Sequence, residues 1–214
     1  MSLVSNLFLL FVAASILIYY IVPRKSQWIV LLIFSYLYYI AGGPRYVVFI
    51  LFSTLVTWLM ALLIEKAEGK ENHKGARKLL ILGLILNFGM LGIVKYTNFA
   101  VENINALLHL NLRGIQLLLP LGISFYTFQS SGYLLDVYWK RCKAERHPLK
   151  YALFVSFFPQ ILQGPIGRYS RLADQLYAEH RFEGNNIIRG FERILWGFFK
   201  KMILADWAAV FADA

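Results

Sequence analysis

The sequence predicts an all-α protein, a polytopic membrane helical bundle of six to seven membrane segments, one of them re-entrant. Of 214 residues, 58% are hydrophobic and only 16% are charged, whereas soluble domains carry about a quarter charged residues. Several apolar runs approach 20 residues, the length that crosses about 30 Å of hydrocarbon. These segments are apolar on all sides, which disfavours the alternative of a water-soluble helical core.

The first four spans are predicted at the apolar runs Leu3–Val22, Trp28–Ala41, Tyr46–Ile64 and Leu79–Val94. The first run lacks the basic start and the cleavage site of a signal peptide, so we expect it to be retained. The charged stretch Glu65–Lys78 is predicted to be a solvated loop. Tyr96–Gln116 is amphiphilic and is expected to lie at a membrane surface.

Four further segments follow in the second half of the chain. Leu117–Val137 is predicted as the fifth span, and Tyr151–Ile166 is apolar but interrupted by prolines. Ser170–Asn186 is polar, and Arg189–Ala212 is predicted as a last helix. No repeat, low-complexity tract or long linker divides the sequence, so residues 1–214 are expected to form a single membrane domain.

The basic residues predict the orientation of the chain. With the N-terminus outside, the inner loops hold twelve basic residues and the outer loops hold three. Because basic residues concentrate in cytoplasmic loops, we expect a multi-pass membrane protein with its N-terminus outside. The net charge of +10 flanks the apolar spans, so it suits anionic lipid headgroups better than nucleic acid.

The fifth span carries polar residues that a lipid-facing helix would avoid. Gln129, Tyr133 and Asp136 fall on one face at helical spacing. They either line a wet cavity or meet local partners, with Asp136 at the cytoplasmic interface. The sequence leaves these two interpretations level. The hydroxyls of a second stripe at Ser124, Thr127 and Ser131 are expected to bond to the backbone.

The segment Tyr151–Ile166 is predicted to be broken at membrane depth. Proline removes a backbone donor and disfavours helical conformation in the residue before it. Broken segments commonly line substrate paths, whereas an ordinary kinked helix is the equal alternative. The candidate path residues here are Pro159, Gln160, Gly164, Pro165 and Arg168.

The last helix supplies three more candidates, Lys200, Lys201 and Asp206. The lysine pair could bind phosphate, but such pairs more often reach toward lipid headgroups. Each histidine is expected to be solvated or structural, because none has a partner at metal or triad spacing. The single Cys142 excludes an intramolecular disulfide. From its own residues the chain shows no catalytic group and no metal site.

Three ordered motifs resemble the membrane-bound O-acyltransferase (MBOAT) family, in its bacterial alginate O-acetyltransferase-like branch. The resemblance covers nearly the whole chain, and it is carried by Leu119–Gln129 with Tyr133–Tyr138, by Phe154–Gln160 with Gly164–Arg168, and by Gly197–Lys201 with Leu204–Asp206. It implies the N-terminal portion of an MBOAT fold, located in the bacterial cytoplasmic membrane.

The resemblance also implies an activity. Family members move an acyl group, typically acetyl, from a cytoplasmic donor such as acetyl-CoA or an acyl carrier to a hydroxyl of an extracytoplasmic polysaccharide or other envelope acceptor. A partner acetyltransferase protein can take part, and no bound cofactor is expected. The family's catalytic histidine lies in a later membrane segment, and none of the four histidines here matches it.

Family members are considerably longer than this chain, so we expect an N-terminal fragment that ends before the catalytic histidine and is inactive alone. Two alternatives stay open. The broken segment and the polar fifth span also fit a membrane transporter or flippase. The missing histidine also fits an inactive fragment that serves as a non-catalytic membrane partner.

Overall fold

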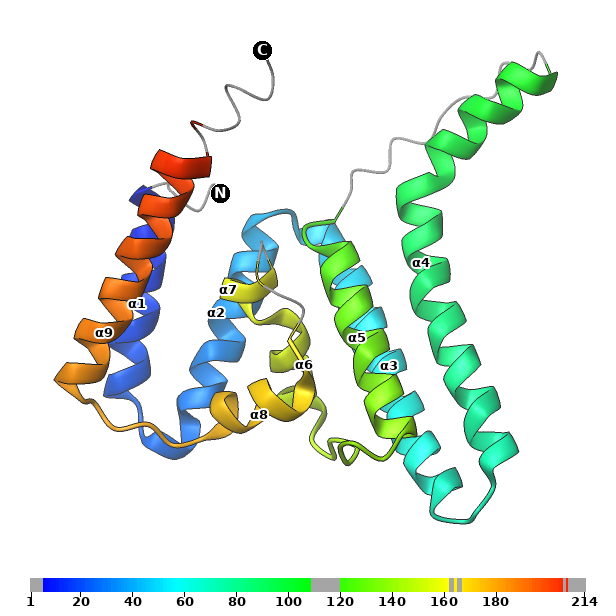
Figure 1. Cartoon of the computed structure of the whole chain (residues 1–214), viewed down its shortest axis with the longest axis horizontal. Helices are drawn as coiled ribbons and strands as arrows, with labels where there is room; N and C mark the ends of the chain where they lie inside the picture. Colours follow the sequence, from blue (N-terminus) through cyan, green and yellow to red (C-terminus); the bar gives the residue numbers. More distant parts are fainter. Residues whose placement is uncertain (1–5, 109–119, 162–163, 165–166, 206, 208–214) are drawn as a thin grey trace. The chain divides into compact units, whose positions relative to one another are not determined.

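The computed structural model describes residues 6–108, 120–161, 164, 167–205 and 207. All regular elements within these residues are helical, which confirms the all-α prediction (Figure 1). The helices are α1 (Asn6–Ile21), α2 (Gln27–Ala41), α3 (Val47–Glu68), α4 (His73–Leu108), α5 (Ile123–Tyr138), α6 (Pro148–Ser156), α7 (Phe158–Ile161), α8 (Tyr169–Tyr177) and α9 (Gly184–Phe199). Three short turns, η1 (Arg24–Ser26), η2 (Pro44–Tyr46) and the π-helical η3 (Lys200–Ala205), flank α2, α3 and α9.

The chain forms two compact units, Met1–Glu179 and His180–Ala214. The first contains α1 to α8, and the second contains α9 and η3. In the second unit, the ring of Trp196 stacks on Phe199 and lies beneath the Lys200 ammonium. The expectation of a single membrane domain stays a prediction.

Two helical segments, Pro44–Glu68 and His73–Leu107, are long and apolar enough to cross a membrane. Helix α1 is apolar but has only 16 residues. Exposed leucine and isoleucine side chains cover the outer faces of these helices, as expected where lipid is the solvent. The number of six to seven membrane segments is not confirmed.

The structure corrects the prediction of a loop at residues 65–78. Helix α3 continues to Glu68 and α4 begins at His73, so only four residues connect them. The charged side chains are accommodated because they find partners at the helix end. Glu65 accepts hydrogen bonds from the Ala144 amide and from Arg146, and Glu68 pairs with Lys140.

Helix α4 also does not end near Val94, where a separate surface segment was predicted. It runs on to Leu108 because residues 95–108 contain neither glycine nor proline. Its 36 residues reach about 54 Å at 1.5 Å per residue, which is longer than the hydrocarbon core. The amphiphilic part is therefore the far end of the same helix.

Two other boundaries differ from the sequence prediction. Helix α5 begins at Ile123 instead of Leu117, because Gly122 has a left-handed backbone with φ of 68°. Residues 109–119 lie outside the described part. The polar stretch 170–186 includes most of helix α8, and the last helix begins at Gly184 instead of Arg189.

In the first unit, α3 packs against α4 and α5, and α6 packs against α2 and α3. Large aromatic side chains fill the space between them. Tyr126 and Tyr133 from α5 and Tyr151 and Phe154 from α6 are almost completely buried. The Tyr133 ring lies 4.7 Å from the Tyr151 ring. This aromatic core fixes the short helix α6 against the long ones.

A buried amide joins α3 to α4. Asn87, which is 1% exposed, accepts a hydrogen bond from Ser53 and donates to Thr57 and to the Gly83 carbonyl, at 2.6, 3.0 and 2.9 Å.

Replacing Asn87 with leucine should lower the unfolding free energy by about 1–2 kcal/mol, because interhelical hydrogen bonds in membranes are worth about 0.6–2 kcal/mol. Titration of the detergent-solubilised protein with dodecyl sulfate measures this loss. Asn98→Leu, the same substitution at an exposed position of the same helix, is the control, and an equal loss in both variants would contradict the prediction.

The basic turns meet at one end of the first unit. The turns after α1, α3 and α5 all lie along the lower side of the first unit in Figure 1. Two contacts connect these turns. The Ala144 amide, in the turn after α5, donates to the Glu65 carboxylate near the end of α3. The Trp28 ring, at the start of α2, lies 5.4 Å from the His147 ring. These contacts keep the basic turns on one side of the first unit.

Candidate functional site

A groove of about 750 Å³ lies between the broken segment and α8. It brings together four of the predicted path residues, Pro159, Gln160, Gly164 and Arg168. Five further residues complete its lining and were missed from the sequence: Phe157, Gly167, Arg171, Leu172 and Gln175. We take this groove as the candidate functional site.

The predicted interruption is present, and it lies at Phe157 between α6 and α7. Phe157 has a ψ of 106°, which turns the chain out of the helix. In an unbroken helix the Phe158 N–H would donate to the Phe154 carbonyl. Here Phe158 N donates to Ser35 Oγ at 3.2 Å, and the Phe154 carbonyl accepts from Gln129 Nε2 at 3.0 Å.

Gln129 and Ser35 therefore replace the helical hydrogen bond that the break removes. Both side chains are buried, at 6% and 0% exposure. Broken backbone at membrane depth persists only where protein or water satisfies it. Gln129 thus supports the wall of the groove from behind, and it is absent from the lining.

Glycines allow the chain to pack closely around the short helix α7. A Cβ on Gly122 would lie 2.6 Å from the Ile161 carbonyl oxygen, and a Cβ on Gly164 would lie 2.8 Å from the Gln160 backbone. A Cβ on Gly167 would meet the Gln160 amide group. The absence of these side chains leaves room for the α7 backbone and for the Gln160 side chain at the groove.

The polar lining of the groove suits an anion. It contains the guanidinium groups of Arg168 and Arg171 and the amides of Gln160 and Gln175, and none of its described residues is acidic. Both arginines are exposed and follow each other at i and i+3, so they lie on one side of the start of α8. Guanidinium groups bind phosphate and carboxylate oxygens through paired hydrogen bonds.

Tyr133, another predicted path residue, contributes to a hydrogen-bonded cluster around Glu145. The Glu145 amide donates to the Tyr133 hydroxyl at 2.8 Å, and the Trp58 indole donates to the Glu145 carbonyl at 2.9 Å. Tyr169 donates to the Glu145 carboxylate at 2.6 Å. Glu145 thereby joins α3, α5 and α8, and no spacing in the sequence indicates this role.

Asp136 lies at the C-terminal end of α5. Its side chain is 3.6 Å from Arg141, and its carbonyl accepts hydrogen bonds from the amides of Arg141 and Cys142. The structure therefore places Asp136 at a helix end, away from the groove lining. The cavity-lining role remains a prediction.

Burial raises the pKa of the Cys142 thiol to about 11, with smaller contributions from the carboxylates of Asp136 and Glu65. Burial likewise raises the pKa of Tyr169 and of Tyr177 in α8. The raised pKa of Cys142 keeps it in the unreactive thiol form at neutral pH.

Iodoacetamide should therefore alkylate Cys142 about 100-fold more slowly in the folded chain than in the dodecyl sulfate-unfolded chain at pH 8, because only the thiolate reacts. The rate should rise with pH until about pH 11. Mass spectrometry of timed samples measures both rates. Lys143→Cys on a Cys142→Ser background provides an exposed control that should react quickly in the folded state. Equal rates at the two positions would contradict the prediction.

The structure does not test whether the remaining predicted path residues belong to the groove. Lys200 and Lys201 belong to the second unit, and Pro165 and Asp206 lie outside the described residues. His73 pairs with Glu68 at 2.9 Å, and His109 also lies outside the described part. Among the described residues no three histidine, cysteine or acidic side chains cluster as metal ligands.

Comparison with known proteins identifies relatives along almost the entire chain. It is 34% identical over 216 residues, 98% of its length, to the "Probable alginate O-acetylase AlgI" of Pseudomonas syringae pv. tomato. The protein of the same name in Pseudomonas aeruginosa gives 34% over 217 residues. The "Peptidoglycan O-acetyltransferase" of Helicobacter pylori is 34% identical over 212 residues, 87% of this chain. The chain is therefore similar, over almost its entire length, to bacterial O-acetyltransferases of the membrane-bound O-acyltransferase family.

The chain spans about two-fifths of the length of these relatives, 41% of both Pseudomonas proteins and 39% of the Helicobacter protein. No family model matches it, and no solved structure matches it. These relatives and the two long apolar helices support a membrane location. They confirm the resemblance predicted from the motifs.

Proposed function

We propose that this chain forms part of a membrane O-acetyltransferase that transfers an acetyl group from a cytoplasmic donor to a hydroxyl of an extracytoplasmic polysaccharide or other envelope glycan. The donor would be acetyl-CoA or an acyl carrier, and the glycan would be reached directly or through a partner acetyltransferase protein. The observation that carries the proposal is the 34% identity, over 98% of the chain, to relatives named as alginate O-acetylases.

The proposal includes a bundle of six to seven membrane segments with the N-terminus outside and the segment around α7 re-entrant. The meeting of the basic turns at one end of the first unit supports this orientation. The short helices α6 and α7, with 9 and 4 residues, are too short to cross about 30 Å of hydrocarbon at 1.5 Å per residue.

The groove at the break would bind an anionic part of the donor or the acceptor. Phosphate groups of a CoA or phosphopantetheine donor and carboxylates of an acidic glycan share this chemistry. Arg168 and Arg171 would hold the charge, and the amides of Gln160 and Gln175 would orient it. The acyl-transfer chemistry itself is not assigned to any described residue.

Replacing Arg168 and Arg171 together with glutamine should reduce envelope O-acetylation to less than about a tenth, since two charge-assisted hydrogen bonds contribute about 1.5–3 kcal/mol each. Base-released acetate from purified envelope glycan of the host strain measures the change. Deletion of the gene should abolish the same signal.

Arg45→Gln is the matched control, because Arg45 is an exposed arginine in η2 that does not line the groove. It should leave O-acetylation near the wild-type value at matched membrane levels. Unchanged acetate after gene deletion would refute the proposed function. Unchanged acetate in the double variant alone would refute only the role of the groove.

A further inference from the structure

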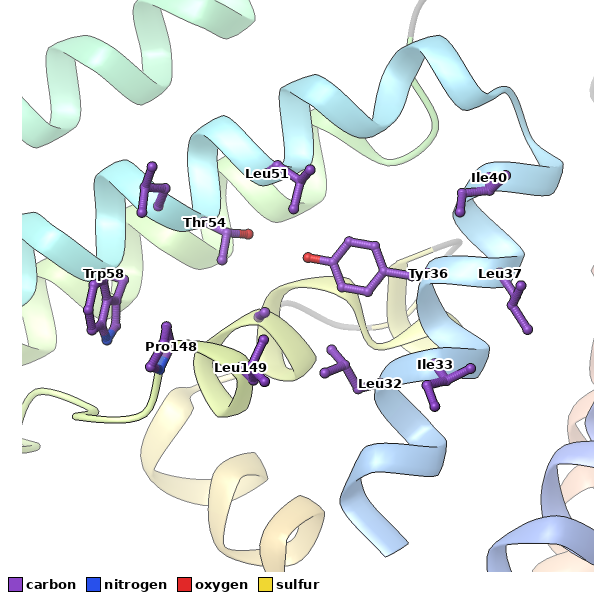
Figure 2. A pocket seen from close by; sticks show the side chains of 12 residues that line it. Leu32, Ile33, Tyr36, Leu37, Ile40, Leu51, Thr54, Trp58, Pro148 and Leu149 are labelled. Atoms are coloured by element: carbon purple, nitrogen blue, oxygen red, sulfur yellow. The ribbon is translucent and has the colours of Figure 1, made fainter. Parts of the chain in front are cut away.

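A second groove, of about 480 Å³, lies between α2, α3 and the first turn of α6 (Figure 2). Its walls are almost entirely apolar and include Leu32, Ile40, Leu51, Trp58 and Ala152. Residues on its rim, such as Leu37 and Leu51, are about half exposed. The groove therefore opens sideways from an apolar surface, where the surrounding solvent is lipid.

Two hydroxyl groups interrupt this apolar lining. Figure 2 shows the Tyr36 hydroxyl and the Thr54 hydroxyl pointing toward each other across the groove. Thr54 is only 7% exposed, and apart from their approach to each other the two hydroxyls have no hydrogen-bond partner among the described residues. A buried hydroxyl without a partner costs about 1–3 kcal/mol, so an occupant that carries a hydrogen-bond acceptor would be stabilised here.

One end of the groove lies at the basic end of the first unit. Trp58 and Pro148 line that end, and Trp58 donates to the Glu145 carbonyl, as interfacial tryptophans do when one side is apolar and the other polar. Lys150 and the turn residues Arg24 and Lys25 lie at the same end, because Trp28 contacts His147. Positive charge at this end complements an anionic lipid headgroup.

We propose that this groove binds one ester-linked acyl chain of an anionic bilayer phospholipid, with the ester carbonyl accepting a hydrogen bond from Tyr36 or Thr54. The spacing along α3 fits this occupant. Thr54 lies four residues before Trp58, about one helical turn of 5.4 Å deeper than the polar end. A glycerol ester lies at a similar depth below its phosphate, and the acyl chain continues along the apolar walls toward Ile40.

Native mass spectrometry of the detergent-solubilised chain tests the proposal. Dipalmitoyl phosphatidylglycerol is compared with its dialkyl ether counterpart, which has the same headgroup and chain length but lacks both ester carbonyls. The wild-type chain should bind the ester lipid about fivefold more tightly, the value of one neutral hydrogen bond. The double variant Tyr36→Phe with Thr54→Val should bind both lipids equally.

The location is tested by filling the groove. Leu51→Trp should reduce binding of both lipids at least tenfold, whereas Val48→Trp, at an exposed position of α3 outside the groove, should leave binding unchanged. The proposal is overturned if the wild-type chain binds no phosphatidylglycerol, if it does not distinguish ester from ether, or if Leu51→Trp binds normally. A dimer of the chain that excludes the lipid would also overturn it.

Discussion

Replacing Gly122 with alanine is expected to lower the unfolding free energy of the first unit by about 3 kcal/mol or more. Two costs combine at this position. The φ of 68° places Gly122 in the left-handed region, where a side chain costs about 1–2 kcal/mol. A Cβ would also lie 2.6 Å from the Ile161 carbonyl oxygen, and this obstacle is backbone, which cannot rotate away.

Gly132→Ala provides a control in the same helix. Apart from its chain neighbours and the backbone of its own helix, no atom of the described residues lies within 4 Å of the added Cβ. Alanine should therefore stabilise α5 by about 0.5–1 kcal/mol because it favours helix. Dodecyl sulfate titration followed by circular dichroism measures both variants. The two substitutions should therefore shift the midpoint in opposite directions. A loss at Gly122 no larger than 1 kcal/mol would show that α7 moves away freely.

The sequence predicts the helices better than their ends. The apolar runs of α1, α2 and α3 are visible because hydrophobicity persists over 15 residues or more. The prediction of a loop at residues 65–78 was wrong, because it relied only on the high density of charged residues there. Glu65 stays helical since its partners come from the distant residues Ala144 and Arg146, and such partners are invisible in a local pattern.

The candidate groove was predictable in part. Proline and glycine drew attention to Pro159, Gln160 and Gly164, because such residues interrupt helices at membrane depth. Arg171 and Gln175 follow Arg168 at i+3 and i+7, so a helical interpretation of the polar stretch would have placed all three on one face. That stretch was not interpreted as a helix, and the two residues were missed.

The polar face of α5 could not be interpreted from spacing alone. Gln129, Tyr133 and Asp136 share a face, yet each has a different local partner in the structure. Spacing shows which direction side chains take, but it does not show that Phe154 on another helix lacks its own hydrogen-bond donor. The break between α6 and α7 leaves the Phe154 carbonyl without a helical donor, and only the tertiary structure reveals this.

Removing both side chains that satisfy the break should be more harmful than removing either one. Gln129→Leu leaves the Phe154 carbonyl without its donor, and Ser35→Ala leaves the Phe158 amide without its acceptor. Each buried group left unpaired costs about 1–3 kcal/mol. The double variant should therefore lose about 2–6 kcal/mol of unfolding free energy, measured by the same titration.

Ser131→Ala is the matched control for Ser35→Ala. Ser131 is also buried, at 5% exposure, but its hydroxyl has no hydrogen-bond partner among the described residues. Its removal should change stability by less than about 0.5 kcal/mol, within the range of substitutions that remove no interaction. If Ser35→Ala and Ser131→Ala behave alike, the Phe158 amide must find another acceptor. The break would then be held mainly by the Phe158 ring, which is buried at 3% exposure and packs against Phe8 and Tyr38.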